Sequence, residues 1–515
     1  MKKQSPCTNC TRLLLLSIIT AFFAFPHCGN GENNEIAVYC NKELGEVNKK
    51  VFGNNFIAYD PATYEDWPQD YYGYSDYGSG VWDAKNNRSV KETVDLAIQA
   101  GMSVIRFPGG CGAHRYNWKN AIGEKRSHFL FGIDEFMRTA QAIGAEAVFT
   151  VSYFSGNVQD AADLVEYLNS PDDGNHRWAK ERAKNGHPAA YGVKYFEIGN
   201  EDWHGDHRQV KAVSPGDYGQ RYLKYYAAMK AVDPAIKIGV ILCCPQWDQE
   251  VLEAVKGSVD FGIMHIYPAA RTKILEVIDR NPYDIFQEAL TQGISQCENN
   301  IQHTLHLLEE KAGMPVPVAI TEYNGGFNQD NPVPYRHCLG TALLNAEFLR
   351  IVMKPQNNVL MANYWQFANS YWGMIYSKND FTSHDYRLPL DYVKRPNYYV
   401  YELYHNHFGD ILVEAAQSNP YLAVNSSKSK DGKKIYLMVI NKDLKSAINA
   451  TIVLNDFSCS QGNSWVLNAA RIDAVNEKDS DNVKVTQKEL RAKGNTFEVT
   501  FPAHSLTAIA IEGKQ

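Results

Sequence analysis

From about residue 50 to residue 370, short apolar runs alternate with longer amphipathic stretches. The apolar runs are rich in Val, Ile, Phe and Tyr and are bounded by Gly, Asn or Pro, which is typical of buried strands. The stretches between them place apolar residues at helical spacing, as residues 160–168 do. The predicted strands are residues 51–58, 103–108, 146–153, 193–200, 237–244, 261–267, 316–322 and 359–367. The predicted helices are residues 89–100, 132–143, 158–169, 214–232, 248–256, 296–312 and 337–353.

This alternation predicts an α/β fold in which the strands close into a (β/α)₈ TIM barrel over residues 51–384. An open doubly wound sheet that binds a dinucleotide fits less well, because no glycine-rich phosphate motif follows the first predicted strand. After residue 385 the pattern changes to short strands separated by Lys, Asp, Gly and Asn turns, as in residues 434–441 and 496–501. We therefore expect a C-terminal antiparallel β-sandwich over residues 385–515, joined by a strand segment at residues 35–50.

The N-terminus has the pattern of a secretory signal. Lys2, Lys3 and Arg12 precede an apolar stretch at residues 13–25, which is too short to span a membrane comfortably. We assign residues 1–28 to a signal peptide and expect an exported protein without a transmembrane segment: periplasmic, secreted, or anchored at the cell surface by a lipid on Cys28.

Charge and cysteine content exclude several other classes of function. A net charge of −7 gives no electrostatic reason to expect binding to nucleic acid or to an anionic membrane. The cysteines beyond the signal are odd in number and scattered, which is not the pattern of a disulfide scaffold. The adjacent Cys243 and Cys244 lack the spaced His or Cys partners of a zinc site, so we expect no metal.

Two of the predicted strands end in a glutamate, and this pair indicates the chemistry. Glu201 closes the run that begins at Val193, and Glu322 closes the run that begins at Val316. In a parallel barrel both would project from the rim that carries the active site. Two facing carboxylates, one an acid/base with a raised pKa and one a nucleophile, are what retaining glycoside hydrolysis requires.

Other polar and aromatic residues at the strand ends could complete such a site. Asn200 could bind a sugar hydroxyl, Tyr267 could donate to the nucleophile, and His265 lies on the same strand face as Tyr267. Arg106 begins an Arg-Phe-Pro-Gly-Gly turn whose glycines allow a ligand close to the backbone. The eighth predicted strand supplies Trp365, as a sugar platform or as core packing, and Gln366 as a hydroxyl contact.

The ordered motifs resemble glycoside hydrolase family 51, which contains α-L-arabinofuranosidases of clan A. The motifs are Arg106–Gly110 with Tyr116–Trp118, then residues 162–169, residues 182–187 and residues 195–201. The resemblance implies Glu201 as acid/base, Glu322 as nucleophile, Asn200 as the partner of the sugar 2-hydroxyl, Tyr267 as the residue that orients the nucleophile, and Gln366 as a substrate contact. It implies no cofactor and an oligosaccharide or polysaccharide substrate, with exo action on arabinofuranoside side chains. Family members are often homo-oligomers.

The sequence departs from the family pattern where the sugar is recognised. Cys111 stands where the family usually has Asn, and Ala58 or Tyr59 stands near the position of a sugar-binding Glu. Loss of a buried polar contact to a hydroxyl changes which sugar is accepted. The alternatives are therefore another clan A activity, such as a xylosidase, a galactofuranosidase or an endo-glucanase, and a carbohydrate-binding protein without catalysis.

Overall fold

The described part of the chain holds both predicted architectures. The computed structural model describes residues 34–57, 80–83, 86–124, 126, 131–205, 210–268, 281–326, 335–368, 372–377, 392–477 and 479–514. The predicted signal segment with Cys28, and the sugar-reading positions Ala58 and Tyr59, lie outside these residues.

Eight parallel strands close into a barrel, which confirms the predicted TIM fold. Neighbouring strands pair in the order β10-β11-β2-β5-β6-β7-β8-β9. All eight lie within or beside the predicted apolar runs, and their inner and outer faces are buried almost throughout, as a barrel core requires. The strands are β2 (Gly53–Asn55), β5 (Val104–Phe107), β6 (Glu146–Val151), β7 (Tyr195–Ile198), β8 (Lys237–Ile241), β9 (Phe261–Ile266), β10 (Val318–Tyr323) and β11 (Val359–Tyr364).

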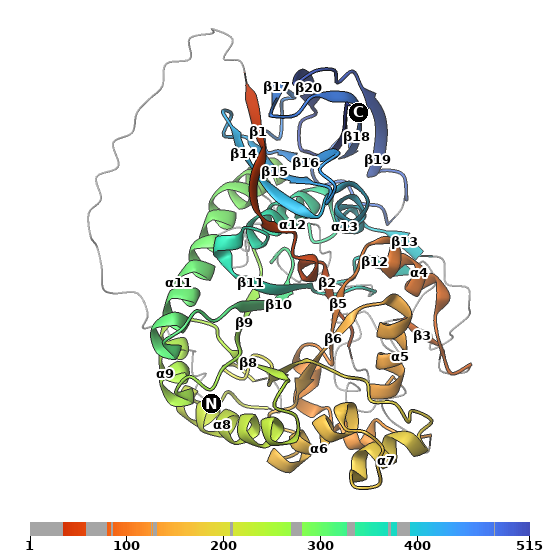
Figure 1. Ribbon diagram of the computed structural model, residues 1–515, viewed down its shortest axis with the longest axis vertical. Coiled ribbons are helices and arrows are strands. Elements are labelled where there is room, and N and C mark those ends of the chain that lie inside the picture. Colours follow the sequence, from red (N-terminus) through yellow and green to blue (C-terminus); the bar gives the residue numbers. More distant parts are fainter. Residues whose placement is uncertain are drawn as a thin grey trace, which may run out of the picture. The chain divides into compact units, whose positions relative to one another are not determined.

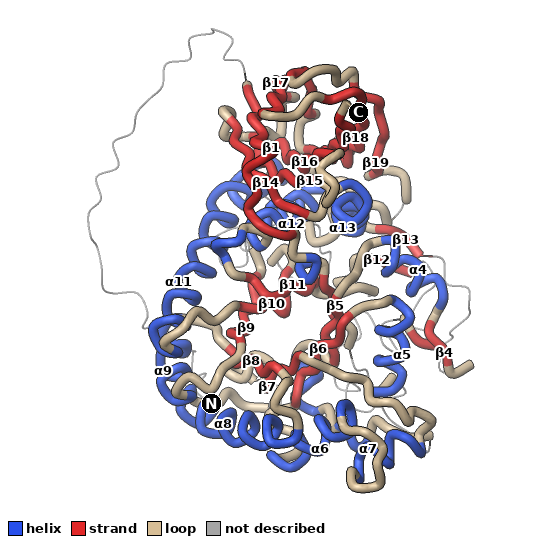
Figure 2. Tube along the Cα trace, in the orientation of Figure 1, coloured by secondary structure: helices blue, strands red, loops and turns tan. Residues whose placement is uncertain are grey.

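Helices surround the barrel strands, as the ribbon in Figure 1 and the tube in Figure 2 show. Local sequence explains where they begin: Asn157 accepts hydrogen bonds from the backbone N–H groups of Gln159 and Asp160 and so caps α6. The helices are α4 (Lys91–Gln99), α5 (Ile133–Ile143), α6 (Val158–Asn169), α7 (Arg177–Lys184), α8 (Pro215–Val232), α9 (Pro245–Val255), α10 (Pro282–Glu288), α11 (Ile294–Ala312), α12 (Leu339–Val352) and α13 (Pro396–His407). Helices α7, α10 and α13 have no counterpart among the predicted ones.

A nine-stranded sheet follows the barrel in sequence and includes the chain's first described strand. Strand β1 (Glu35–Glu46) pairs antiparallel with β14 and parallel with β17, whereas the other pairs in this sheet are antiparallel. The sheet encloses its own apolar core, which includes Ile36, Leu437 and Phe501. Its other strands are β14 (Ile411–Gln417), β15 (Leu422–Lys428), β16 (Lys434–Asn441), β17 (Ile448–Asn455), β18 (Cys459–Asn468), β19 (Lys484–Leu490), β20 (Thr496–Phe501) and β21 (Ser505–Gly513).

Two helices connect the barrel to the sheet. All residues of α12 except Arg350 are buried, because this helix packs on the barrel and also against β15, β16 and β21. Helix α13 contacts β18, β19 and β21 and lies in the segment that sequence alone assigned to the sandwich. Two hairpins, β3 (Trp82–Asp83) with β4 (Arg88–Ser89) and β12 (Ile375–Ser377) with β13 (Tyr392–Lys394), complete the described strands.

Candidate active site

The C-terminal ends of the barrel strands gather the polar residues that the sequence singled out. Glu201 follows β7, Glu322 lies near the end of β10, and His265 lies in β9. One carboxylate oxygen of Glu201, one of Glu322 and one ring nitrogen of His265 all lie within 4.8 Å of one another. The two predicted catalytic carboxylates therefore face each other across the barrel mouth.

Arg106 organises the floor of this site from β5. Its guanidinium is fully buried and donates to Glu197, to Oε1 of Glu322 at 2.8 Å and to Oδ1 of Asn200 at 2.7 Å. It also donates to Oδ1 of Asn55 at 3.2 Å. A buried guanidinium with this many charged and amide partners fixes the positions of Glu322 and Asn200 together.

Glu322 receives a second strong hydrogen bond from Tyr267. The Tyr267 hydroxyl donates to Oε2 of Glu322 at 2.6 Å, on the oxygen that Arg106 does not use. Burial, and then the negative charge of Glu322, raise the pKa of Tyr267 well above its ordinary value, so the phenol keeps its proton. Glu322 is thus held as an oriented acceptor from two sides.

Glu201 lies between two histidines. Its Oε1 is 2.7 Å from Nδ1 of His265, and its Oε2 is 2.5 Å from Nε2 of His204. Burial alone would raise the pKa of Glu201, but the hydrogen bonds and charges of the two histidines outweigh burial and lower it. From the sequence we expected a raised pKa for the acid/base, whereas the surroundings of Glu201 in the structure lower its pKa.

His265 explains where a proton can be held instead. Burial alone would lower the pKa of His265, but the charge of Glu322 and the hydrogen bond with Glu201 outweigh burial and raise it. Its Nε2 lies 3.1 Å from Oγ1 of Thr321, which fixes the plane of the ring. The two shifts have opposite directions, and both favour an ionised Glu201 beside a protonated His265 imidazole.

The Gly-Asn-Glu turn has a geometry that depends on its glycine. Gly199 has a φ of +86°, and a Cβ there would lie 1.9 Å from Oδ2 of the buried Asp202. Glu201 itself has a φ of +48°, a left-handed conformation that costs energy for a residue with a side chain. This strained turn aims the Glu201 carboxylate at the barrel mouth.

Two of the buried amides that the sequence singled out carry polar atoms that have no partner among the described residues. These are Nδ2 of Asn200 and both Oε1 and Nε2 of Gln366. Buried polar groups are almost always hydrogen-bonded, so these unpartnered amide atoms, which include one on the residue before Glu201, indicate groups that wait for a ligand. Trp365 lies next to Gln366 with its indole against the backbone of Gly109 and Gly110, where a Cβ would lie within 2.8 Å of the ring.

The comparisons with known proteins agree with this geometry. Residues 98–281 match the model of the "Alpha-L-arabinofuranosidase 1 domain", and residues 322–505 match that of the "Alpha-L-arabinofuranosidase C-terminal domain". The chain belongs to the α-L-arabinofuranosidase family. It is therefore a glycoside hydrolase, with Glu201 inside the first matched region and Glu322 at the start of the second.

Individual relatives of this arabinofuranosidase family cover nearly the whole chain. An intracellular exo-α-L-arabinofuranosidase of Bacteroides ovatus is 23% identical, over 85% of this chain and 90% of its own length. An α-L-arabinofuranosidase of Thermotoga maritima, solved with arabinose, is 23% identical with a TM-score of 0.78, covering 93% of this chain and all of its own. The family 51 enzyme of Thermotoga petrophila is 24% identical with a TM-score of 0.76 and the same coverage.

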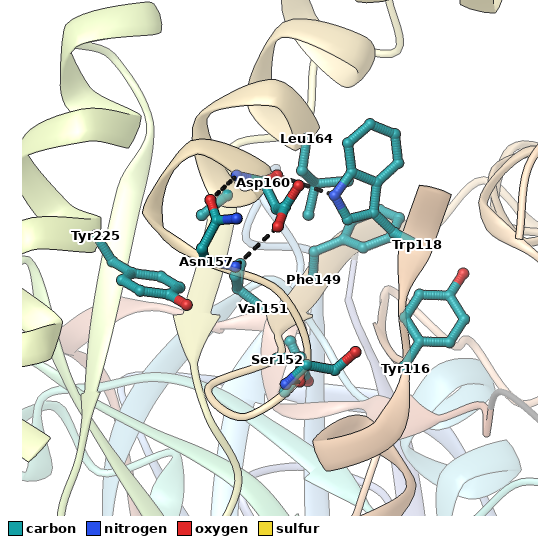
Figure 3. Close-up of a pocket in the computed structure, with 12 residues that line it drawn as sticks. Tyr116, Trp118, Phe149, Val151, Ser152, Asn157, Asp160, Leu164 and Tyr225 are labelled. Atoms are coloured by element: carbon teal, nitrogen blue, oxygen red, sulfur yellow. Dashed lines mark hydrogen bonds between the residues drawn. The ribbon is translucent and has the colours of Figure 1, made fainter. Parts of the chain in front are cut away.

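The described residues of this family member line a larger hollow at the site and a smaller one beside a neighbouring strand. The larger, about 310 Å³, begins at Glu201 and Tyr267, passes Trp203, and reaches the first turns of α9 and α11. The smaller, about 20 Å³, lies beside β6, where Trp118 donates to the Asp160 carbonyl at 2.9 Å (Figure 3). A volume this small admits about one water molecule, so the motif around Trp118 holds α6 in place rather than a sugar.

Several residues of the arabinofuranosidase-family site were missed from sequence. Glu197 lies in the middle of β7, fully buried, and accepts hydrogen bonds from Arg106 and from Thr150. A carboxylate inside an apolar strand was a readable signal, because burying it is costly without a partner. His204 and Asn55 carried no such signal.

Among the described residues, no helix is both long and apolar enough to cross a membrane.

Proposed function

We propose that this glycoside hydrolase removes terminal α-L-arabinofuranosyl residues from polysaccharide side chains, with retention of anomeric configuration. The observation that carries the retaining mechanism is the approach of the two carboxylates to within 4.8 Å. Retaining enzymes place these groups about 5–5.5 Å apart, whereas inverting enzymes need roughly 6.5–9.5 Å to admit a water molecule.

Glu322 acts as the nucleophile in this proposal. Arg106 and Tyr267 each hold one of its oxygens, so the attacking lone pair keeps one direction. Attack on the anomeric carbon forms the glycosyl-enzyme ester and breaks the bond to the leaving oxygen. As the ester forms, Glu322 loses its charge, and the Tyr267 hydroxyl and Arg106 can turn toward the ring oxygen and neighbouring hydroxyls.

Glu201 protonates the leaving oxygen and then takes a proton from water. Because the hydrogen bonds of His204 and His265 lower the pKa of Glu201, and the pKa of His265 is raised, the proton needed in the first step is held on His265. Entry of the sugar displaces water from the carboxylate, which favours transfer of the proton from imidazole to Glu201. In the second step the carboxylate is already in the form that a general base requires.

Asn200 and Gln366 bind sugar hydroxyls through the polar atoms that have no other partner among the described residues. The Asn200 side chain is held by Arg106 through Oδ1, which points its Nδ2 group toward the substrate. Cys111 begins the short helix after the Pro-Gly-Gly turn and lies close to Glu201. Its thiol stands where the family usually has the side-chain amide of an asparagine. These residues set which furanose ring is accepted.

The sugar, the exo mode and the stereochemistry are tested together. The Bacteroides relative is named an exo-α-L-arabinofuranosidase, which supports this choice over a xylosidase, a galactofuranosidase or an endo-glucanase. We expect hydrolysis of nitrophenyl α-L-arabinofuranoside and not of the matched xyloside or galactofuranoside, with the α-anomer released first in a proton NMR time course. Release of the β-anomer first would reject the retaining mechanism, and cleavage only inside long chains would reject exo action.

We also propose that the protein is exported. The support is the N-terminal pattern of basic residues followed by an apolar stretch at residues 13–25. The Bacteroides relative is named intracellular, so the two proteins would differ in location. Fractionation of cells that express the full chain decides the question, and cytoplasmic protein that retains residues 1–28 would contradict export.

Replacing Tyr267 by phenylalanine removes the hydroxyl that donates to Glu322 without creating a large cavity. A hydrogen bond to a charged group contributes roughly 1.5–3 kcal/mol, so we expect kcat to fall about 10- to 100-fold. The matched control is Tyr226→Phe on α8, a partly buried tyrosine remote from Glu322. Steady-state kinetics on an aryl arabinofuranoside measure both variants, and an unchanged kcat for Tyr267→Phe would remove Tyr267 from the mechanism.

A further inference from the structure

Three potential metal ligands of different chemistry meet beside Glu201. The thiol of Cys111, a carboxylate oxygen of Glu201 and a ring nitrogen of His204 all lie within 4.8 Å of one another. Cys111 starts the short helix after the Pro-Gly-Gly turn, whereas His204 follows Glu201 in the loop after β7. Each of the three is partly exposed, so an ion can reach them from the barrel mouth.

The ligand set selects a class of metal ion. Thiolate, imidazole and carboxylate together are ligands of Zn²⁺, whereas Ca²⁺ and Mg²⁺ prefer oxygen atoms alone. Three protein ligands leave the fourth tetrahedral position to water, which is the arrangement of an open zinc site. Glu201 can join without losing its other contact, because His265 uses Oε1 and His204 faces Oε2.

A second group of potential ligands shares Glu201 but is less suited to a cation. Glu201, His265 and Glu322 also lie within 4.8 Å of one another. However, the guanidinium of Arg106 lies 2.8 Å from Glu322, and its positive charge repels a metal ion at that position. The group with Cys111 differs in containing a thiol, a ligand type that Zn²⁺ accepts and hard cations do not favour.

We propose that Cys111, His204 and Glu201 form a Zn²⁺-binding site that reversibly inhibits the enzyme. A bound ion replaces the hydrogen bond between Glu201 and His204, and the carboxylate can then no longer exchange a proton with the leaving oxygen. The inhibition rests on the proposed role of Glu201 as acid/base, but the binding of metal does not.

Metal binding is tested without substrate. Co²⁺ added to the full chain is expected to give the intense near-ultraviolet band of a thiolate-bound ion, and calorimetry measures Zn²⁺ affinity. Cys111→Ser should abolish the band and weaken Zn²⁺ binding by at least about 100-fold. Losing a residue that only hydrogen-bonds to a metal ligand already weakens binding by up to about 100-fold, and Cys111 is itself a ligand. Cys297→Ser, a buried cysteine outside the group, is the matched control and should change neither. His204→Gln is a second variant and should weaken Zn²⁺ binding similarly.

The adjacent Cys243 and Cys244 could also bind the added Co²⁺ and give a thiolate band. Their sulfur atoms lie 3.0 Å apart in the wall of the larger cavity. A band that survives Cys111→Ser and disappears in Cys243→Ser/Cys244→Ser would overturn the proposed site. Zn²⁺ should inhibit wild-type hydrolysis in competition with the aryl glycoside, and a chelator should restore it. If the chain binds Zn²⁺ through Cys111 but has no glycosidase activity, the metal site stands and the proposed function is rejected. If the chain is active but does not bind Zn²⁺ through Cys111, the proposed function stands and the metal site is rejected.

Discussion

Replacing Glu322 by alanine should lower kcat on an aryl arabinofuranoside by on the order of 10⁶-fold, as loss of a covalent nucleophile does in other hydrolases. The fold should persist, because Arg106 keeps Glu197, Asn200 and Asn55 as partners. Azide can enter the space left on that face of the sugar, and it should give a glycosyl azide of inverted configuration. Circular dichroism controls for folding, and a variant that keeps most of its activity would show that another residue is the nucleophile.

The matched variant Glu201→Ala should behave differently on the same substrates. Its rate should fall by about 10²–10⁴-fold for poor leaving groups, which need a proton, and much less for leaving groups that depart unprotonated. Azide should then attack the ester on Glu322 and give a product of retained configuration. If both variants give the same azide product, the assignment of roles to the two carboxylates is wrong.

Replacing Arg106 by leucine should destabilise the protein by about 3–5 kcal/mol, because the change leaves Glu197 buried without its charged partner. The measurement is the free energy of unfolding in a denaturant titration. Arg471 is the matched control: it pairs with Asp473 at 2.8 Å but its side chain is 63% exposed, so Arg471→Leu should leave the unfolding midpoint unchanged.

A double variant separates the missing charge from the missing packing. Arg106→Met combined with Glu197→Met removes both buried charges and should recover part of the lost stability. Activity should not recover, since Glu322 and Asn200 have still lost their common donor. A loss below about 1 kcal/mol in Arg106→Leu would mean that water enters and solvates Glu197.

The sequence predicts this fold well because a barrel strand is buried on both faces. The runs ending at Glu201 and Glu322 stand out as apolar segments, and parallel strands bring their C-terminal ends to one rim. Pairs on one strand, such as His265 and Tyr267, follow from alternation alone. Contacts between strands cannot be predicted in this way. The hydrogen bonds from Arg106 to Glu197 and Asn55 depend on the closure and register of the barrel.

The protonation states of the site could not be predicted from the sequence, for a related reason. The low pKa of Glu201 depends on His204, which reaches back from a loop three residues later, and on His265 from another strand. A position in the chain says nothing about how such side chains fold back. Cys111 and His204 meet for the same reason, and the spacing of cysteines and histidines could not show it.

The position of β1 has a consequence for how the chain is made. This strand leaves the ribosome before the barrel, yet its neighbours β14 and β17 are synthesised only after the barrel is complete. Until then, both of its edges offer unpaired backbone groups to other chains. Such a long-range pairing is slow to form, so final assembly waits for the C-terminal strands. Truncation from the C-terminal end would therefore release β1 as an aggregation-prone edge and not leave an independent barrel.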